Sequence, residues 1–506
     1  MNRFVWCFLL TIVPSSSAFC SKYFEFSPQA KDAYNRIFSL RFEEARLTLD
    51  GLKQHEPDNL MAVFLENYLE VLGIGVDDDE AAYNRLSKNM DTRLYQLSRG
   101  EPRSPYYRYT QAETRLQWAV LRAQFGDYLS SLSDIKLAYA LLEENARRFP
   151  DFVANKKSLG ILHALVGNVP DDYRWAIRLI GGMKGNIAQG LAELESVLAF
   201  AKNNDFVFEE ESLIAYGILQ LHLNNQGTKA WNTLKTSKLT PKTSPLGAIT
   251  LATIGLRIGQ TDATIKLLKE MPAGGTYHTF YHRDFLLGMA KMYRLDTDAN
   301  IPLQSFIEHT KGKNAVKEAY QKLAWHQLLQ GNTAGYYRFM WQVKQQGTAR
   351  SDPDKVALRE ANKDEMPDTR LLKARLLFDG GYYSRAFDLL RNNLADYASS
   401  PRNSLEYQYR MGRIAHKMGK VAAATQYYES TIAMGEKMPW YFACNAALQL
   451  GTLLEEKSDA KNARFWYQKC LSLHPEEYAG SLHAKAKAGL NRLTVDGGRR
   501  TADGGW

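Results

Sequence analysis

Cysteine is scarce in this chain of 506 residues, which contains four, at Cys7, Cys20, Cys444 and Cys470. So few cysteines exclude the disulfide-dense framework of a small secreted scaffold. Proline is also sparse, with 16 residues, and long stretches contain neither proline nor glycine. The alternation of Val, Ile and Thr that strands need is rare. Together with 45% hydrophobic residues, these absences predict a well-packed all-α protein.

Clusters of positive charge are missing as well. The formal net charge is +9, but the basic residues are spread along the chain in pairs such as Arg147-Arg148 and Arg499-Arg500. Nucleic-acid-binding proteins usually gather such residues on one face, where they displace counterions from the phosphates. The dispersed charge is typical of solvated helix faces, and we expect no nucleic-acid partner.

Long apolar segments are absent beyond the N-terminus. Near its start the chain has a short positive segment, Asn2-Arg3, followed by the apolar stretch Phe4 to Val13, which Pro14 then breaks. Small residues for cleavage follow at Ser16 and Ala18. This order predicts a signal peptide at residues 1–18 and an exported protein. The apolar stretch would be about 15 Å long as a helix, too short for a transmembrane span.

Cys20 offers a second interpretation of this N-terminus. The sequence Ser17-Ala18-Phe19-Cys20 resembles a bacterial lipoprotein box, although Phe19 is bulky where that box has a small residue. Acylation of Cys20, giving a lipid anchor, is therefore an alternative to plain cleavage. In either case we expect the protein in the periplasm or at the outer-membrane periphery if it is bacterial.

Motifs for catalysis are also lacking. The chain contains no G-x-S-x-G, C-x-x-C or HExxH sequence. His278 and His282 have the i, i+4 spacing of two metal ligands on a helix, but they lack the glutamate of a zinc protease and a third ligand. We therefore predict no metal, no cofactor and no enzymatic activity. An enzyme with a site assembled from distant segments is the least favoured alternative.

What the chain does have is a repeated helical hairpin in its last third. The clearest copy runs from Cys444 to Pro475, with small residues at its positions 8 and 20 (Gly451 and Ala463), an aromatic residue at 24 (Tyr467) and proline at 32. Two earlier copies place small residues at the same positions, so that Ala386, Ala424 and Ala463 recur 38 to 39 residues apart.

These offsets resemble the tetratricopeptide repeat, whose unit is about 34 residues long. The resemblance implies a right-handed α-solenoid of stacked antiparallel helix pairs. It also implies a protein that binds partners, because solenoids present extended surfaces and seldom carry out chemistry. Traced upstream, the template predicts a divergent helical-repeat region at residues 19–346, a linker loop at 347–368, a C-terminal repeat array at 369–493 and a disordered tail at 494–506.

A second, weaker resemblance lies near the middle of the chain. Tyr173-Arg174-Trp175-Ala176-Ile177-Arg178-Leu179-Ile180-Gly181-Gly182, followed by Gly185, Gly190-Leu191 and Leu194, is similar to the central segment of the tetratricopeptide repeat protein 39 family. The motif covers about thirty residues. It implies a non-enzymatic helical-repeat protein.

The repeat template also predicts a binding surface, because certain positions of the first helix of each repeat line the concave face. These positions predict partner-binding residues at Arg375, Tyr409, Arg413, His416 and Lys417, with Glu406 beside them. Their mixed charge suits a polar peptide, with Tyr409 as an aromatic anchor. An ordinary solvated groove, with binding elsewhere, is the alternative.

Cys444 and Cys470 occupy positions 1 and 27 of one repeat. The start of the first helix lies beside the end of the second in a hairpin, and an exported protein permits a disulfide between them. Two small buried residues at packing positions are the favoured alternative.

The favoured function is an exported, non-catalytic scaffold that binds a protein or peptide through its concave face. The runner-up is an outer-membrane lipoprotein that binds glycan or another nutrient. The sequence indicates neither the partner nor the oligomeric state.

Overall fold

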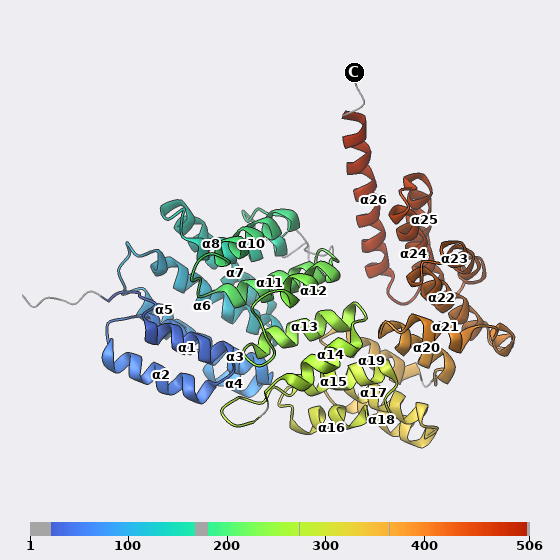
Figure 1. The fold of residues 1–506 in the computed structure, drawn as a ribbon, viewed down its shortest axis with the longest axis horizontal. Coiled ribbons are helices and arrows are strands. Elements are labelled where there is room, and N and C mark those ends of the chain that lie inside the picture. Colours follow the sequence, from blue (N-terminus) through green and yellow to red (C-terminus); the bar gives the residue numbers. More distant parts are fainter. Residues whose placement is uncertain (1–21, 167–180, 273, 364, 503–506) are drawn as a thin grey trace, which may run out of the picture. The chain divides into compact units, whose positions relative to one another are not determined.

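The computed structural model describes residues 22–166, 181–272, 274–363 and 365–502, with no side-chain description beyond residue 493. The prediction of an all-α protein is confirmed over these residues, which form 25 α-helices and no strand (Figure 1). A single isolated bridge joins Tyr23 to Asn59.

The chain divides into two compact units. The first contains Met1–Ile74 and Ala81–Val207, and the second contains Gly75–Glu80 and Phe208–Trp506. The helices that begin before residue 207 are α1 (Pro28–Phe38), α2 (Phe42–His55), α3 (Met61–Asp77), α4 (Glu80–Leu86), α5 (Asn89–Leu97), α6 (Pro105–Gln124), α7 (Tyr128–Arg148), α8 (Val153–Val166) and α10 (Ile187–Ala201).

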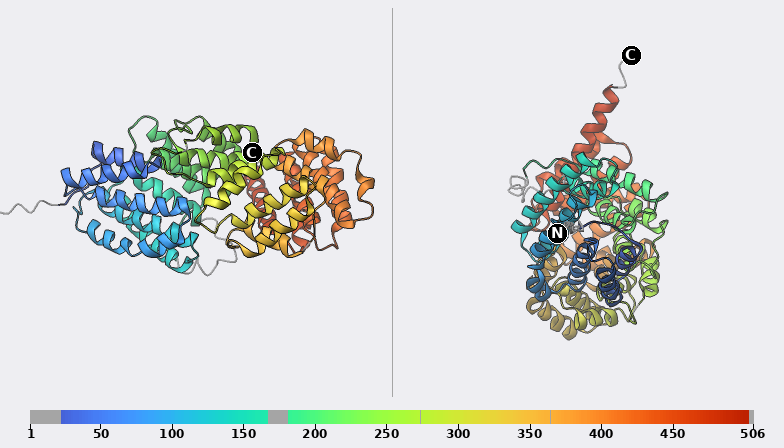
Figure 2. Two further views of the ribbon diagram at one scale, coloured as in Figure 1. Left: turned by 90° about the horizontal axis from the view of Figure 1, so that it is seen from below. Right: turned by 90° about the vertical axis from the view of Figure 1, so that its left-hand side faces the viewer.

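The second unit holds the remaining helices, which follow one another as hairpins (Figure 2). They are α11 (Glu209–His222), α12 (Gly227–Lys235), α13 (Pro245–Arg257), α14 (Thr261–Glu270), α15 (His282–Arg294), α16 (Asn300–His309), α17 (Val316–Leu329), α18 (Thr333–Gln345), α19 (Asp352–Lys363), α20 (Thr369–Asp379), α21 (Tyr383–Leu390), the short 3₁₀ helix η2 (Leu394–Tyr397), α22 (Pro401–Lys417), α23 (Val421–Gly435), α24 (Phe442–Glu456), α25 (Ala460–Ser472) and α26 (Ala479–Ala502).

Local sequence explains where many of these helices begin and turn. Serine caps the N-terminus of α6, α13 and α22, and proline follows as the first helical residue in each case. That order suits a helix start, because serine accepts an amide N–H and proline has none to leave unpaired. The turns after α20 and α22 contain Gly381 and Gly419, whose φ angles of 84° and 72° favour glycine.

The C-terminal helices pack as consecutive hairpins. Each of the pairs α20–α21, α22–α23 and α24–α25 forms a hairpin, and α22 and α24 also contact the first helix of the neighbouring pair. Ala386, Ala424 and Ala463, the small residues of the three second helices, are fully buried. These contacts and buried alanines are consistent with an α-solenoid.

The first unit also contains helical hairpins, and a buried ion pair lies in its core. Helix α1 packs on α2, α6 on α7, and α8 on α10. Lys157 of α8 is fully buried, and its Nζ lies 3.1 Å from Glu113 Oε2 of α6. Such a pair depends on both partners, because removing one leaves an uncompensated buried charge.

The expected linker loop at residues 347–368 is wrong, because these residues contain the helix α19. The reason is a local capping sequence: Ser351 Oγ accepts from the amide of Asp354, and Pro353 occupies the first turn. This Ser-x-x-Asp arrangement starts a helix, although proline and charge also suggested a loop.

The expectation of a disordered tail at 494–506 is corrected for residues 494–502, which continue α26, and residues 503–506 lie outside those that the structure describes. Three expectations fall on residues outside those that the structure describes. They are the signal peptide at 1–18, acylation of Cys20, and the motif from Tyr173 to Ile180. Gly190 of the same motif lies in α10, where an added Cβ would come within 2.3 Å of the Gly160 carbonyl oxygen of α8.

Candidate functional site

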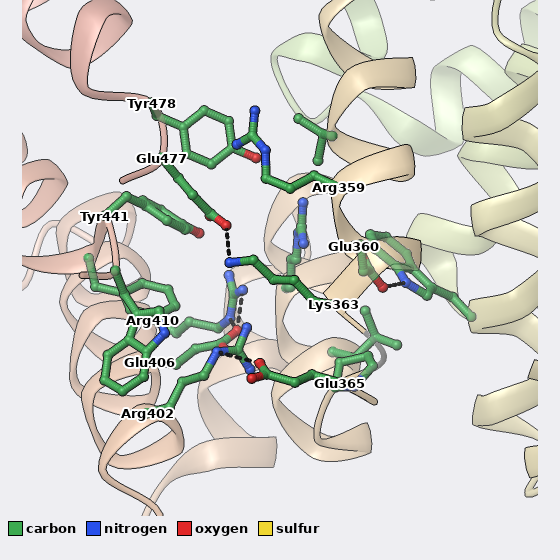
Figure 3. A pocket seen from close by; sticks show the side chains of 17 residues that line it. Arg359, Glu360, Lys363, Glu365, Arg402, Glu406, Arg410, Tyr441, Glu477 and Tyr478 are labelled. Carbon is green, nitrogen blue, oxygen red and sulfur yellow. Dashed lines mark hydrogen bonds and ion pairs between the residues drawn. The ribbon is translucent and has the colours of Figure 1, made fainter. Parts of the chain in front are cut away.

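A pocket opens in the second unit, among helices that are far apart in the sequence (Figure 3). Its volume is about 110 Å³, enough for several water molecules or one small side-chain group. It is lined by residues of α17, α19, α20, α22 and α24 and by the segments that precede α20, α24 and α26: Trp325, Val356, Arg359, Glu360, Lys363, Glu365, Pro367, Leu372, Arg375, Arg402, Glu406, Arg410, Trp440, Tyr441, Phe442, Glu477 and Tyr478.

Helix α19 supplies one wall of this pocket. Asp354, fully buried, fixes the helix: its carboxylate accepts from the backbone amides of Ala315 and Glu318, at 2.9 and 3.0 Å, at the N-terminus of α17. A carboxylate is stabilised there because the unpaired amides carry partial positive charge. Helical spacing then places Arg359 and Lys363 on the same face of α19.

Helix α20 contributes Arg375, the one predicted partner-binding residue that lines the pocket. Its guanidinium lies 4.9 Å from the ring centroid of Trp325. The indole N–H of Trp325 in turn donates to Glu360 Oε1 at 2.7 Å. Burial works against the charge of Arg375, but Tyr441, Asp379 and Glu360 raise its pKa above the usual arginine value.

Helix α22 contributes an ion pair on another wall. Arg410 Nε donates to Glu406 Oε1 at 2.8 Å, and both residues are buried. Burial alone would raise the pKa of Glu406, but the charges of Arg410 and Arg402 outweigh it and hold that pKa below its usual value. Glu406 is therefore ionised and balances Arg410.

The segments before α24 and α26 complete the lining. They are joined by a backbone hydrogen bond from the Glu476 amide to the Pro439 carbonyl, at 3.0 Å. The rings of Tyr441 and Tyr478 pack edge to face, with their centroids 5.1 Å apart. Lys363 Nζ of α19 lies 2.6 Å from Glu477 Oε1, so that an ion pair spans the pocket (Figure 3).

The other predicted partner-binding residues do not line this pocket. Tyr409 is 2% exposed and belongs to the core, where its hydroxyl accepts from Arg413 Nη1 and Asn445 Nδ2 at 2.8 and 2.7 Å. The expectation that it serves as an exposed aromatic anchor is therefore corrected. A tyrosine whose ring is buried can satisfy its hydroxyl inside the protein, and the repeat template does not distinguish this case.

Arg413, His416 and Lys417 lie along the same helix, α22. The Arg413 guanidinium lies over the Phe378 ring, with its Cζ 4.7 Å from the ring centroid. His416 contacts Tyr428 and Glu456, each at 3.3 Å, and burial lowers its pKa. Lys417 is exposed.

Sequence reasoning missed most of the pocket, including Arg359, Lys363, Trp440, Tyr441, Glu477 and Tyr478. The first two were assigned to a loop, although the Ser351-x-x-Asp354 cap could have identified their helix. The other four lie just before or at the start of a helix, outside the positions that the repeat template scores.

Cys444 and Cys470 are both buried and free in this structure. Their sulfur atoms are 3.6 Å apart, on α24 and α25. Their mutual hydrogen bond lowers the pKa of Cys444 and raises that of Cys470. The two thiols are adjacent enough to pair in an oxidising compartment, and their disulfide stays a prediction.

His278 and His282 have separate surroundings. His278 Nε2 lies 2.6 Å from Asp77 Oδ1, whereas burial lowers the pKa of His282 to about 4. Across the described residues, no group of three or more His, Cys, Asp or Glu side chains is arranged to hold a metal ion.

Two further findings concern the chain as a whole. No helix within the described ranges is both long and apolar enough to cross a membrane. A scan of protein-family models and a search of curated proteins find no match to this chain.

Proposed function

We propose that this chain is an exported, non-catalytic helical-repeat scaffold, a right-handed tetratricopeptide-like solenoid that binds a protein or peptide partner. The pocket described above would be the centre of its binding surface. The observation that supports this most strongly is the lining itself. Tryptophan, tyrosine and arginine side chains converge there from four helices and from the segments before α24 and α26, and these are the residue types enriched at binding hot spots.

The charges of the pocket favour a polar partner over an apolar one. Arg359, Lys363, Arg375, Arg402 and Arg410 alternate with four glutamates around the aromatic rings. A purely hydrophobic segment would remove these charges from water without replacing their hydrogen bonds, which is costly. A polar peptide offers such replacements, and its own aromatic or aliphatic groups can cover the rings.

Site-specific crosslinking tests this function. A photoreactive phenylalanine in place of Trp440, a partly buried pocket residue, would capture a bound partner in extracts of the native organism. The matched control carries the same group at Phe465, which is 57% exposed on α25 and does not line the pocket. We expect a discrete protein adduct from position 440 alone.

The crosslink should also depend on the pocket charges. Arg359→Glu should abolish the adduct at position 440, whereas Lys417→Glu should leave it intact. Equal adducts at positions 440 and 465, or an adduct that survives Arg359→Glu, would place the binding surface elsewhere. No protein adduct at position 440 would contradict the scaffold proposal.

Export and anchoring form a separate part of the proposal. Mass spectrometry of the mature protein should show an N-terminus at Phe19 if Ala18 is the cleavage site. A diacylglyceryl group on Cys20 would instead support the membrane-tethered alternative, and an N-terminus at Met1 would contradict export.

A further inference from the structure

The cations and carboxylates of the pocket do not balance. Five cationic side chains and four glutamates line it, leaving a net charge of +1. Three of the glutamates face a cation: Glu406 faces Arg410 at 2.8 Å, Glu477 faces Lys363 at 2.6 Å, and Glu365 lies 3.8 Å from Arg402. Glu360 instead accepts from the side chains of Trp325 and Gln321.

Arg359 carries a donor that the surrounding residues do not satisfy. Its guanidinium lies 5.5 Å from the ring centroid of Tyr478. Its Nη1 is buried and has no hydrogen-bond partner among the residues that the structure describes. A buried donor without an acceptor is unfavourable, so such a group in a pocket indicates a place for a ligand acceptor.

Arg375 is in a similar position. One face of its guanidinium stacks on Trp325, and its side chain keeps 35% of its surface exposed. The carboxylate recorded nearest to it, that of Asp379, lies 3.9 Å away, beyond hydrogen-bonding distance. A guanidinium held by its face presents its N–H edge, and that edge matches the two oxygens of a carboxylate.

We infer that this pocket binds a carboxylate group of the partner, held by Arg359 and Arg375, and that Glu477 competes with it for Lys363. One negative charge balances the net charge of the lining. The volume of about 110 Å³ admits a carboxylate with a few waters. This inference rests on the proposed function and specifies the chemistry of its ligand.

Peptide selection on the full-length protein tests the inference. Two random phage-displayed peptide libraries serve as probes, one with peptides embedded in the coat protein and one ending in a free C-terminus. We expect the selected peptides to be enriched in Asp or Glu if the carboxylate is a side chain. Enrichment confined to the free-ended library would identify a C-terminal carboxylate.

Variants then measure the contribution of each charge to the affinity of a selected acidic peptide. Arg359→Gln should weaken binding about tenfold or more, as expected for one charge-assisted hydrogen bond. Arg375→Gln should have a comparable effect. Lys417→Gln removes the same charge from an exposed site outside the pocket and should leave the affinity unchanged. Circular dichroism checks that each variant is folded.

Glu477→Gln should instead raise the affinity for acidic peptides. Without the competing carboxylate, Lys363 is free and the pocket gains one positive charge, so acidic peptides should bind several-fold more tightly. Unchanged or weaker binding would contradict the competition.

The outcomes separate this inference from the proposed function. Peptides that bind the pocket but lack acidic residues, with affinities insensitive to Arg359→Gln and Arg375→Gln, would overturn the carboxylate inference and leave the scaffold function standing. No selected peptide from either library, together with no adduct from position 440, would contradict both.

Discussion

Gly412 shows how one missing side chain sets the distance between two helices. A Cβ added to this residue of α22 would lie 2.7 Å from Tyr428 Cδ1 of α23 and 3.3 Å from the Tyr427 Cβ. Tyr428 is fully buried, so its ring has no space into which it can move. Gly451 of α24 has the same relation to Tyr467 of α25, at 2.7 Å. A glycine opposite a tyrosine is therefore the common packing unit of the last two hairpins.

Gly412→Ala should reduce the free energy of unfolding by about 1–3 kcal/mol, because the added methyl group overpacks this contact. Urea denaturation followed by circular dichroism measures the change. Gly480→Ala is the matched control: nothing lies within 4 Å of its Cβ position, and its stability should stay the same or rise slightly. Equal effects of the two substitutions would show that the packing does not limit this helix pair.

Glu210 of α11 connects stability to pH. Burial raises the pKa of its carboxyl group to about 7, and Ser244 Oγ donates to it. The unfolded chain has the ordinary value near 4.5. Because the folded state binds this proton more tightly, the stability that it contributes is fully present below pH 4.5 and is lost as the pH rises through 7.

Glu210→Gln should therefore stabilise the protein above pH 7 and have little effect at pH 4. The gain should be about 1–2 kcal/mol, since the group is not fully removed from solvent. Thermal unfolding of both proteins across this pH range measures it. A constant difference in melting temperature between pH 4 and pH 8 would contradict the assignment.

Helix α19 is held in place by hydrogen bonds between its Asp354 side chain and the start of α17. Its Asp354 accepts from Ser351 Oγ and from the amides of Ala315 and Glu318. The same side chain thus starts α19 and caps α17, and in doing so it fixes the wall of the pocket that carries Arg359 and Lys363.

Asp354→Ala should cost about 2–3 kcal/mol, because it leaves buried amides without an acceptor. It should also weaken binding of acidic peptides. Asp352→Ala, two residues earlier, removes the same charge from a side chain that is 93% exposed, and should change neither property. Chemical denaturation and peptide titration of the two variants make the comparison.

How much of the structure can be predicted from the sequence differs from one element to the next. The small residues Ala386, Ala424 and Ala463 predicted three hairpins, because hairpin packing is local and recurs with a fixed period. Arg375 was identified as a site residue by the same template. The exposed role expected for Tyr409 failed, since a template position does not say how neighbouring side chains cover it. Lys363 and Glu477 meet across the pocket through tertiary packing, which no local pattern records.

The chain as a whole does not divide where its composition suggested. The boundary expected at 347–368 falls inside the second unit, whose contacts also include the distant segment Gly75–Glu80. Within this unit, the Asp78 carboxylate accepts from the amides of Lys313 and Asn314, at 3.0 and 3.1 Å. Asp78 thus organises the loop before α17.

Asp78→Ala should release this loop. Hydrogen exchange at the amides of Lys313 and Asn314 should become faster, because both lose their acceptor. Asp78→Asn retains one carbonyl oxygen and should restore part of the protection. Unchanged exchange in the alanine variant would show that the loop is held by other contacts.

The ion pair between Lys363 and Glu477 joins residues 114 positions apart. Solenoids fold largely through contacts between neighbours, so each hairpin can form as soon as it has been synthesised. The pocket cannot form so early, because two of its walls come into contact only after the residues near 477 have been synthesised. A chain interrupted after α25 would therefore contain folded hairpins without a complete pocket, and the binding that we propose for this pocket could begin only once the segment before α26 is in place.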